Sequence, residues 1–209
     1  MKKNLILTMI LLGMTFLIST KTFAVDKTFL VSATVPAATG VSISAFSVSG
    51  TPPVFTAVTG TSLSFNPLTF EATNKIYLPD HFFAIDVSPT GGAGNPDVSF
   101  TYTEGKNPNS PGHGLGFKST ATFVKVTGPT NSPVETGIAA HGPKKLLKDL
   151  ASETIKKTET TGGFLRIYLG VVTLDPNATF KDPTGAEVFS NADAAGPYDG
   201  SLLISATLP

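Results

Sequence analysis

The sequence predicts an all-β protein whose strands form an antiparallel β-sandwich. Two observations lead to this fold class. Short apolar runs are separated throughout by turn residues, with 20 glycines and 16 prolines in 209 residues. Several of these runs also alternate apolar and polar residues with a period of two, which places one face of each strand against a core and the other in water. The chain is about one domain long and has no cysteine, so its core must hold without disulfides.

The first 24 residues read as an export signal. Lys2 and Lys3 form a positive start, residues 5–18 are almost continuously apolar, and a small residue, Ala24, ends the segment. We expect cleavage after Ala24. The alternative is an uncleaved membrane anchor, but the apolar run is short for a bilayer span and no charged cluster follows it.

Residues 25–35 form the first predicted strand and would be the free N-terminus after cleavage. Its odd positions form one face that is apolar except for a lysine, whereas its even positions are mostly polar. Two interpretations follow: an ordinary first strand of its own domain, or a strand that completes the fold of another molecule. The residues on this face are Val25, Lys27, Phe29, Val31, Ala33 and Val35.

The remaining strands follow in order along the chain. Pro67 should mark an edge or a bulge, because proline cannot donate a ladder hydrogen bond. The last strand, 201–208, carries a clean apolar face at Leu202, Ile204, Ala206 and Leu208. The strands predicted before it cover residues 41–48, 62–70, 75–78, 82–87, 98–102, 122–126 and 164–172.

Residues 144–157 depart from the strand pattern. Leucine and isoleucine recur there among lysine, aspartate and glutamate, which predicts a short amphipathic helix. It would cover one end of the sandwich as a crossover. The alternative, a membrane-surface helix, is disfavoured by its short length and mixed charges.

Composition and motifs argue against several functions. The 15 basic and 15 acidic residues balance and together make up 14% of the chain, so no basic field attracts nucleic acid. His81, His113 and His141 are scattered, and no metal site or cofactor is expected. Residues 111–119 resemble a phosphate-binding loop, but Phe117 stands where that motif needs glycine, so we interpret them as a surface loop. No nucleophile motif or paired carboxylates are found, and we do not expect an enzyme.

Both ends of the predicted mature chain resemble a known family. Residues 25–35 read Val, acidic, Lys, any, apolar, any, Val, Ser, Ala, Thr, Val, which is similar to the mature N-terminus of the alpha-type (class five) chaperone–usher fimbrial major subunits, relatives of colonisation-factor and cable pilins. Residues 195–200 resemble the Ala-Gly-x-Tyr-x-Gly ending of that family, and residues 68–71 resemble a shorter internal motif. The chain departs from the pattern at Pro36, where the family has an acidic residue, and in a longer stretch over residues 104–162.

The resemblance implies an incomplete immunoglobulin-like sandwich that is completed by donor-strand exchange. Residues 1–24 would be the signal peptide, 25–36 the donor strand and 37–209 the pilin domain. The face formed by Val25, Lys27, Phe29, Val31, Ala33 and Val35 would enter a neighbouring subunit beside the strand that carries Leu202, Ile204, Ala206 and Leu208. A periplasmic chaperone would fill the same groove before assembly at an outer-membrane usher, and the product would be a cell-surface fimbria with a tip adhesin that mediates adhesion.

Two questions stay open at this stage. Lys27 would either place its amine in water at the mouth of the groove or form a salt bridge to the neighbouring subunit. The alternative function is a secreted monomeric β-sandwich that binds a surface glycan or protein, and it predicts exposed aromatic residues grouped on one face. With no tryptophan and four tyrosines, the composition gives that alternative little support.

Overall fold

The computed structural model describes residues 29–34, 40–109, 113–128, 135–174 and 181–208 of the chain. The predicted signal peptide lies outside these residues. The described part is mostly β, with antiparallel sheets and a few short helices, which confirms the predicted class. No helix in these ranges is long and apolar enough to cross a membrane.

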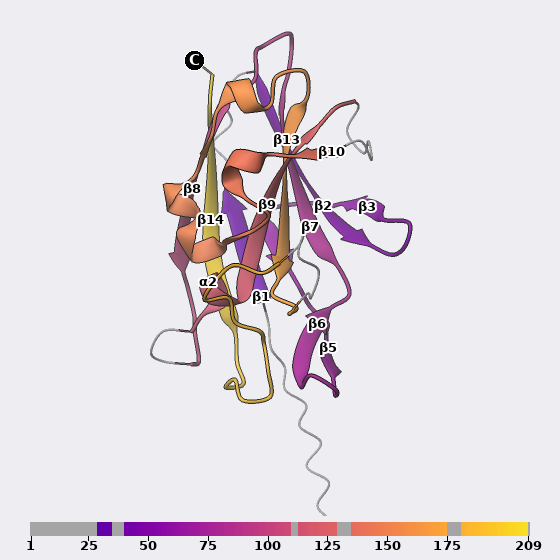
Figure 1. Ribbon diagram of the computed structural model, residues 1–209, viewed down its shortest axis with the longest axis vertical. Helices are drawn as coiled ribbons and strands as arrows, with labels where there is room; N and C mark the ends of the chain where they lie inside the picture. Colours follow the sequence, from indigo (N-terminus) through magenta and orange to yellow (C-terminus); the bar gives the residue numbers. More distant parts are fainter. Residues whose placement is uncertain (1–28, 35–39, 110–112, 129–134, 175–180, 209) are drawn as a thin grey trace, which may run out of the picture.

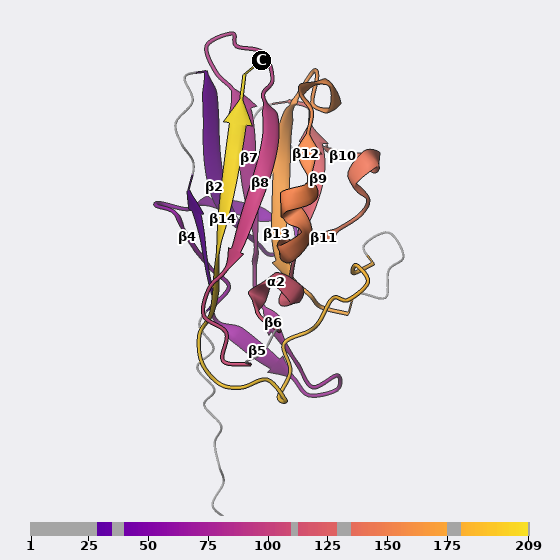
Figure 2. The ribbon, with the colours of Figure 1, turned by 90° about the vertical axis from the view of Figure 1, so that its left-hand side faces the viewer.

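Two large sheets make up most of the fold (Figures 1 and 2). The first sheet has five strands, and its edges are β12 and β4. Its central strand, β14, is the longest in the structure and runs antiparallel to β8. In spatial order this sheet contains β12 (Thr154–Ile155), β8 (Asp97–Glu104), β14 (Tyr198–Thr207), β1 (Phe29–Thr34) and β4 (Ser62–Ser64).

The second sheet has seven strands, and all its pairings are antiparallel. A separate two-stranded hairpin of β5 (Leu68–Glu71) and β6 (Ile76–Pro79) extends from one end of the molecule. In spatial order the large sheet contains β10 (Glu135–Gly137), β9 (Ser119–Val126), β13 (Phe164–Val171), β7 (Phe82–Pro89), β2 (Val41–Ser49) and β3 (Val54–Ala57), with β11 (Lys145–Leu146) also paired to β9.

One hydrophobic core lies between the two sheets. Alternate residues of β7, β9 and β13 face it from the seven-stranded sheet, and alternate residues of β8 and β14 face it from the other. Phe100 and Phe123 meet across this core with ring centroids 5.2 Å apart. The period-two pattern in the sequence therefore corresponds to real buried faces.

The amphipathic helix predicted over residues 144–157 is much shorter than expected and is not an α-helix. The segment holds a six-residue 3₁₀ helix, η2 (Leu147–Ser152), between the two-residue strands β11 and β12. Leu147 and Leu150 are fully buried, and a spacing of three places them on one side of a helix with three residues per turn. Because β11 must pair with β9 and β12 with β8, only a short helical turn fits between them.

Two further predictions need correction. The strand predicted over residues 62–70 is divided into β4 and β5, and a cis bond precedes Pro67 in the break. Of the surface loop predicted over residues 111–119, the structure describes residues 113–119, which are mostly buried and contain α2 (Leu115–Lys118), with Lys118 at 2% exposure. Glu104 accepts hydrogen bonds from the backbone N–H groups of Leu115 and Gly116 at 2.8 and 2.9 Å, which fixes the start of this turn. The other helical turns are η1 (Ala139–His141) and η3 (Lys157–Glu159).

Candidate subunit interface

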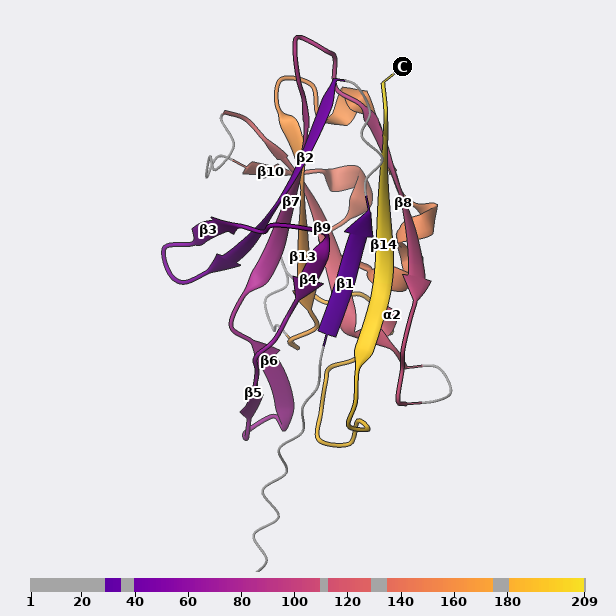
Figure 3. The same ribbon diagram turned by 180° about the vertical axis from the view of Figure 1, so that it is seen from behind.

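Strand β1 occupies the position between β14 and β4, which we call the β1 slot (Figure 3). It runs parallel to β14, with Phe29 opposite Tyr198 and Thr34 opposite Leu203. It runs antiparallel to β4, with Val31 opposite Leu63. Every other strand pairing in the described residues is antiparallel, so the pair of β1 and β14 is the one parallel pairing among them.

Val31 fixes β1 to the core. Its side chain is fully buried in the main core cluster, together with Leu63 and Leu202. Of the other predicted donor residues, Phe29 and Ala33 lie within β1, while Val25, Lys27 and Val35 fall outside the described residues. The single chain thus holds this strand in its own sheet, which is the arrangement expected of an ordinary first strand.

The predicted acceptor residues lie along β14 and just beyond it. Leu202 and Ile204 are fully buried in the core, and Ala206 and Leu208 are half-buried. The register of β1 reaches only as far as Leu203, so the pairing covers the first six of the ten residues of β14.

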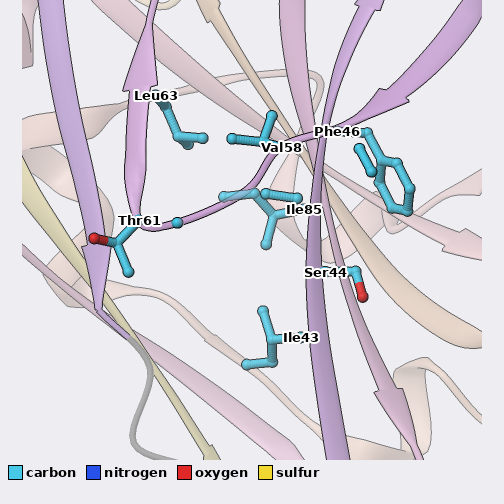
Figure 4. A pocket seen from close by; sticks show the side chains of 10 residues that line it. Ile43, Ser44, Phe46, Val58, Thr61, Leu63 and Ile85 are labelled. Carbon is cyan, nitrogen blue, oxygen red and sulfur yellow. The ribbon is translucent and has the colours of Figure 1, made fainter.

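A hollow of about 450 Å³ borders the β1 slot (Figure 4). It lies between β4 and β2, and its lining includes Leu63 of β4, Ile43 of β2 and Ile85 of β7. Val58 and Thr61, in the connection that leads to β4, complete the rim shown in the figure. Leu63 is also opposite Val31 in the ladder, so one residue of β4 borders both the hollow and the slot.

The beginning of β2 lies at the end of the molecule where β14 finishes. Gly40 precedes β2, has φ +94°, and accepts a hydrogen bond from the Thr90 N–H at 2.8 Å. A Cβ placed on Gly40 would come within 2.9 Å of the Leu208 Cδ1 atom. The beginning of β2 and the end of β14 are therefore in contact.

Sequence reasoning missed two features of this site. One is that the partner β4 is a separate strand of three residues, since residues 62–70 were predicted as one continuous strand. The parallel direction of β1 was also not foreseen, because alternation reports which face of a strand is buried and says nothing about its neighbours.

Buried ionic groups elsewhere connect loops to the sheets. Lys118 binds Asp193 at 2.9 Å and lies 5.2 Å from the centre of the Phe189 ring, so it is not available to a phosphate. Burial would raise the pKa of Asp193, but hydrogen bonds from the Ser190 backbone and Lys118 outweigh it and lower that pKa.

His141, the last residue of η1, contacts the residue that follows η2 and the last residue of η3. Its Nδ1 atom lies 2.6 Å from the Glu153 carboxylate and its Nε2 atom 3.1 Å from Glu159. Burial opposes ionisation of Glu153, but hydrogen bonds from His141 and Lys145 prevail and lower its pKa. In the described ranges no group of three histidine, cysteine, aspartate or glutamate side chains is arranged to hold a metal ion.

No family model matches the chain, and no curated protein or solved structure matches it either.

Proposed function

We propose that this chain is a structural pilin subunit that polymerises by exchanging its first strand, in an immunoglobulin-like sandwich that is incomplete without that strand. The observation that carries the proposal is the position of β1. This N-terminal segment pairs on both sides with strands distant in sequence and places Val31 at 0% exposure in the core. The motif at residues 25–35 supports the same conclusion independently.

An empty β1 slot would be unfavourable, because it would expose unpaired backbone groups and apolar core. The edges of β14 and β4 would lose their main-chain partners, and apolar core around Leu63 and Leu202 would meet water. An identical strand from another copy, inserted in the same direction as β1, can restore every one of these contacts, so exchange in that direction has little cost at equilibrium. Since the chain has no cysteine, such a link would be non-covalent and based on hydrogen bonds and burial.

The direction of β1 constrains how copies could join. The segment between Thr34 and β2 spans six residues, which reach at most about 20 Å when extended. A strand donated in the direction of β1 would bring together the ends of two molecules at which β14 finishes. That contact is between like ends and favours a closed pair. An open fibre therefore requires the donated strand to run against β14, so that unlike ends meet.

The surroundings of the assembly follow from the family resemblance. A periplasmic chaperone would occupy the slot before export through an outer-membrane usher, and the fimbria at the cell surface would carry a tip adhesin. These partners are part of the proposal.

A reversible lock on β1 tests the exchange. Ser32 and Ser201 are directly opposite in the parallel pair, and the chain has no other cysteine to interfere with Ser32→Cys and Ser201→Cys. The oxidised double variant should stay monomeric when incubated near its unfolding midpoint, whereas the reduced form should produce oligomers in size-exclusion chromatography and electron microscopy. Each single variant is a matched control. Equal oligomer formation by the oxidised form, or a reduced form that never associates, would reject the proposal.

A further inference from the structure

The outer face of the seven-stranded sheet carries a second hollow, of about 760 Å³, unrelated to the β1 slot. It lies over β7, β13 and β9, on the side opposite the shared core. Alternation places Phe82, Tyr168 and Thr122 toward this side, while their neighbours in sequence, such as Phe83 and Leu169, face the core. We call it the outer-face hollow.

A glycine leaves the floor of the outer-face hollow bare. Gly170 lies opposite Thr120 in the β9–β13 ladder, and a Cβ placed on it would meet nothing within 4 Å. On the other side of β13, the ladder with β7 ends at the pair of Leu169 and Phe83. Phe82 follows that pair on β7 and therefore lies beside Gly170. The space above Gly170 is therefore bounded by an aromatic ring on one side and a threonine on the other.

The aromatic wall is exposed and firmly supported. Phe82 keeps 39% exposure, and its ring meets that of Tyr168 edge to face at 5.5 Å. The Tyr168 hydroxyl donates a hydrogen bond to Glu135. Burial, followed by this hydrogen bond, raises the pKa of Tyr168 to about 12, so the hydroxyl remains a donor at neutral pH.

A buried arginine, two residues before Tyr168 on the same face of β13, supports the tyrosine side of this wall. Arg166 is fully buried, and its guanidinium donates to both carboxylate oxygens of Asp86, at 2.6 and 2.9 Å. It also donates to Glu135 at 2.8 Å, and the ring of Phe55 covers it at 4.7 Å. A site whose supporting side chains are locked in this way is preorganised for a ligand.

The charges around the outer-face hollow are already matched. Lys144 binds Asp182 at 2.8 Å, His81 bonds the Asp80 carboxylate at 2.5 Å, and Glu135 is paired with Arg166 at 2.8 Å. Such a lining offers hydrogen bonds of both kinds but no uncompensated charge, so it favours a neutral polar ligand over an ion.

The sheet topology disfavours a peptide in this hollow. A peptide that extends a sheet needs an unpaired strand edge. The floor strand β13 is paired with β7 on one side and with β9 on the other. An occupant must therefore be recognised by the side chains that line the hollow and not by pairing with the backbone of β13.

We propose that the outer-face hollow binds a neutral saccharide. One pyranose ring lies above Gly170 with its apolar C–H face against Phe82, because the negative face of an aromatic ring attracts partly positive C–H groups. The hydroxyls of Thr120 and Thr122 and the ammonium of Lys144 supply the polar contacts. This binding goes beyond the polymer-forming role and does not depend on it, since the hollow and the β1 slot share no residue.

Saccharide binding to the mature chain tests this inference. An array of neutral and anionic glycans, followed by ligand-observed NMR with methyl β-galactopyranoside, methyl β-glucopyranoside and methyl α-mannopyranoside, should identify a neutral pyranose ligand. Gly170→Val fills the floor and Phe82→Ala removes the wall, so each should weaken binding by about tenfold or more. Phe70→Ala, at a ring of similar exposure (43%) on β5, is the matched control and should bind like the wild type.

Circular dichroism will establish that each variant is folded, and the oxidised double-cysteine chain permits the same measurements on a monomer. Absence of any neutral ligand, a preference for anionic glycans, or unchanged binding by folded Gly170→Val would overturn the inference. Failure of strand exchange would leave these measurements unaffected, so the two proposals can fail separately.

Discussion

Replacing Val31 by alanine measures how strongly β1 is held in its slot. The side chain is fully buried beside Leu63 and Leu202, so the substitution removes two methyl groups from a packed core. At about 0.8 kcal/mol per group this is about 1.6 kcal/mol. The cavity left behind should increase the loss to roughly 2–3 kcal/mol, because neighbouring residues collapse only in part.

Urea unfolding of the purified mature chain would measure this loss of unfolding free energy directly. The midpoint of thermal unfolding should fall by about 2–4 °C for each kcal/mol lost. Val54→Ala is the matched control, because it makes the same chemical change in another strand at a side chain that is 59% exposed. It should shift stability by no more than about 0.5 kcal/mol. If both variants lose the same small amount, β1 does not contribute to the core of the soluble protein and the reasoning about the slot is wrong.

Three other substitutions have expected outcomes. Asp86→Ala should cost about 3–5 kcal/mol in urea unfolding, because it leaves Arg166 buried without its main partner; a loss below about 1 kcal/mol would contradict this. Glu153→Gln should lower stability at neutral pH. The difference in stability from wild type should shrink as the pH falls below the ordinary carboxyl pKa of 4.5, since a lowered pKa contributes stability that is lost on protonation. Thermal unfolding across that pH range would show a constant difference if the carboxylate played no part. Gly163→Ala should destabilise the turn before β13, because a Cβ there would collide with the Val126 carbonyl oxygen, whereas Gly137→Ala, with open space around it, provides the comparison in the same assay.

The strands could be predicted from sequence because their chemistry is local. The last strand shows it best: its alternate apolar residues Leu202 and Ile204 are fully buried, as the period-two pattern requires. The strands around Phe83, Phe100 and Phe123 were found for the same reason. In each strand, the alternation of apolar and polar residues predicts which face is buried.

Features that depend on distant residues could not be predicted. The segment holding Leu147 has a helical pattern, but pairing with β9 and β8 at its two ends restricts it to a 3₁₀ turn. Arg166 reads in the sequence as one polar residue in an apolar strand, and only the fold brings it to Asp86 and Glu135. The motif at residues 25–35 predicts strand donation, but whether the strand pairs in its own sheet or in that of a neighbour depends on the association of two molecules, which one sequence does not encode locally.

The placement of Phe82 and Val31 on different sheets has a consequence for attachment to surfaces. Linking copies through β1 would use none of the residues that line the outer-face hollow, so each added copy would contribute one more sugar-sized contact. Individually weak contacts repeated on one object act together through their high effective concentration. A filament of such copies would then hold firmly to a carbohydrate-coated surface while any single copy detached readily.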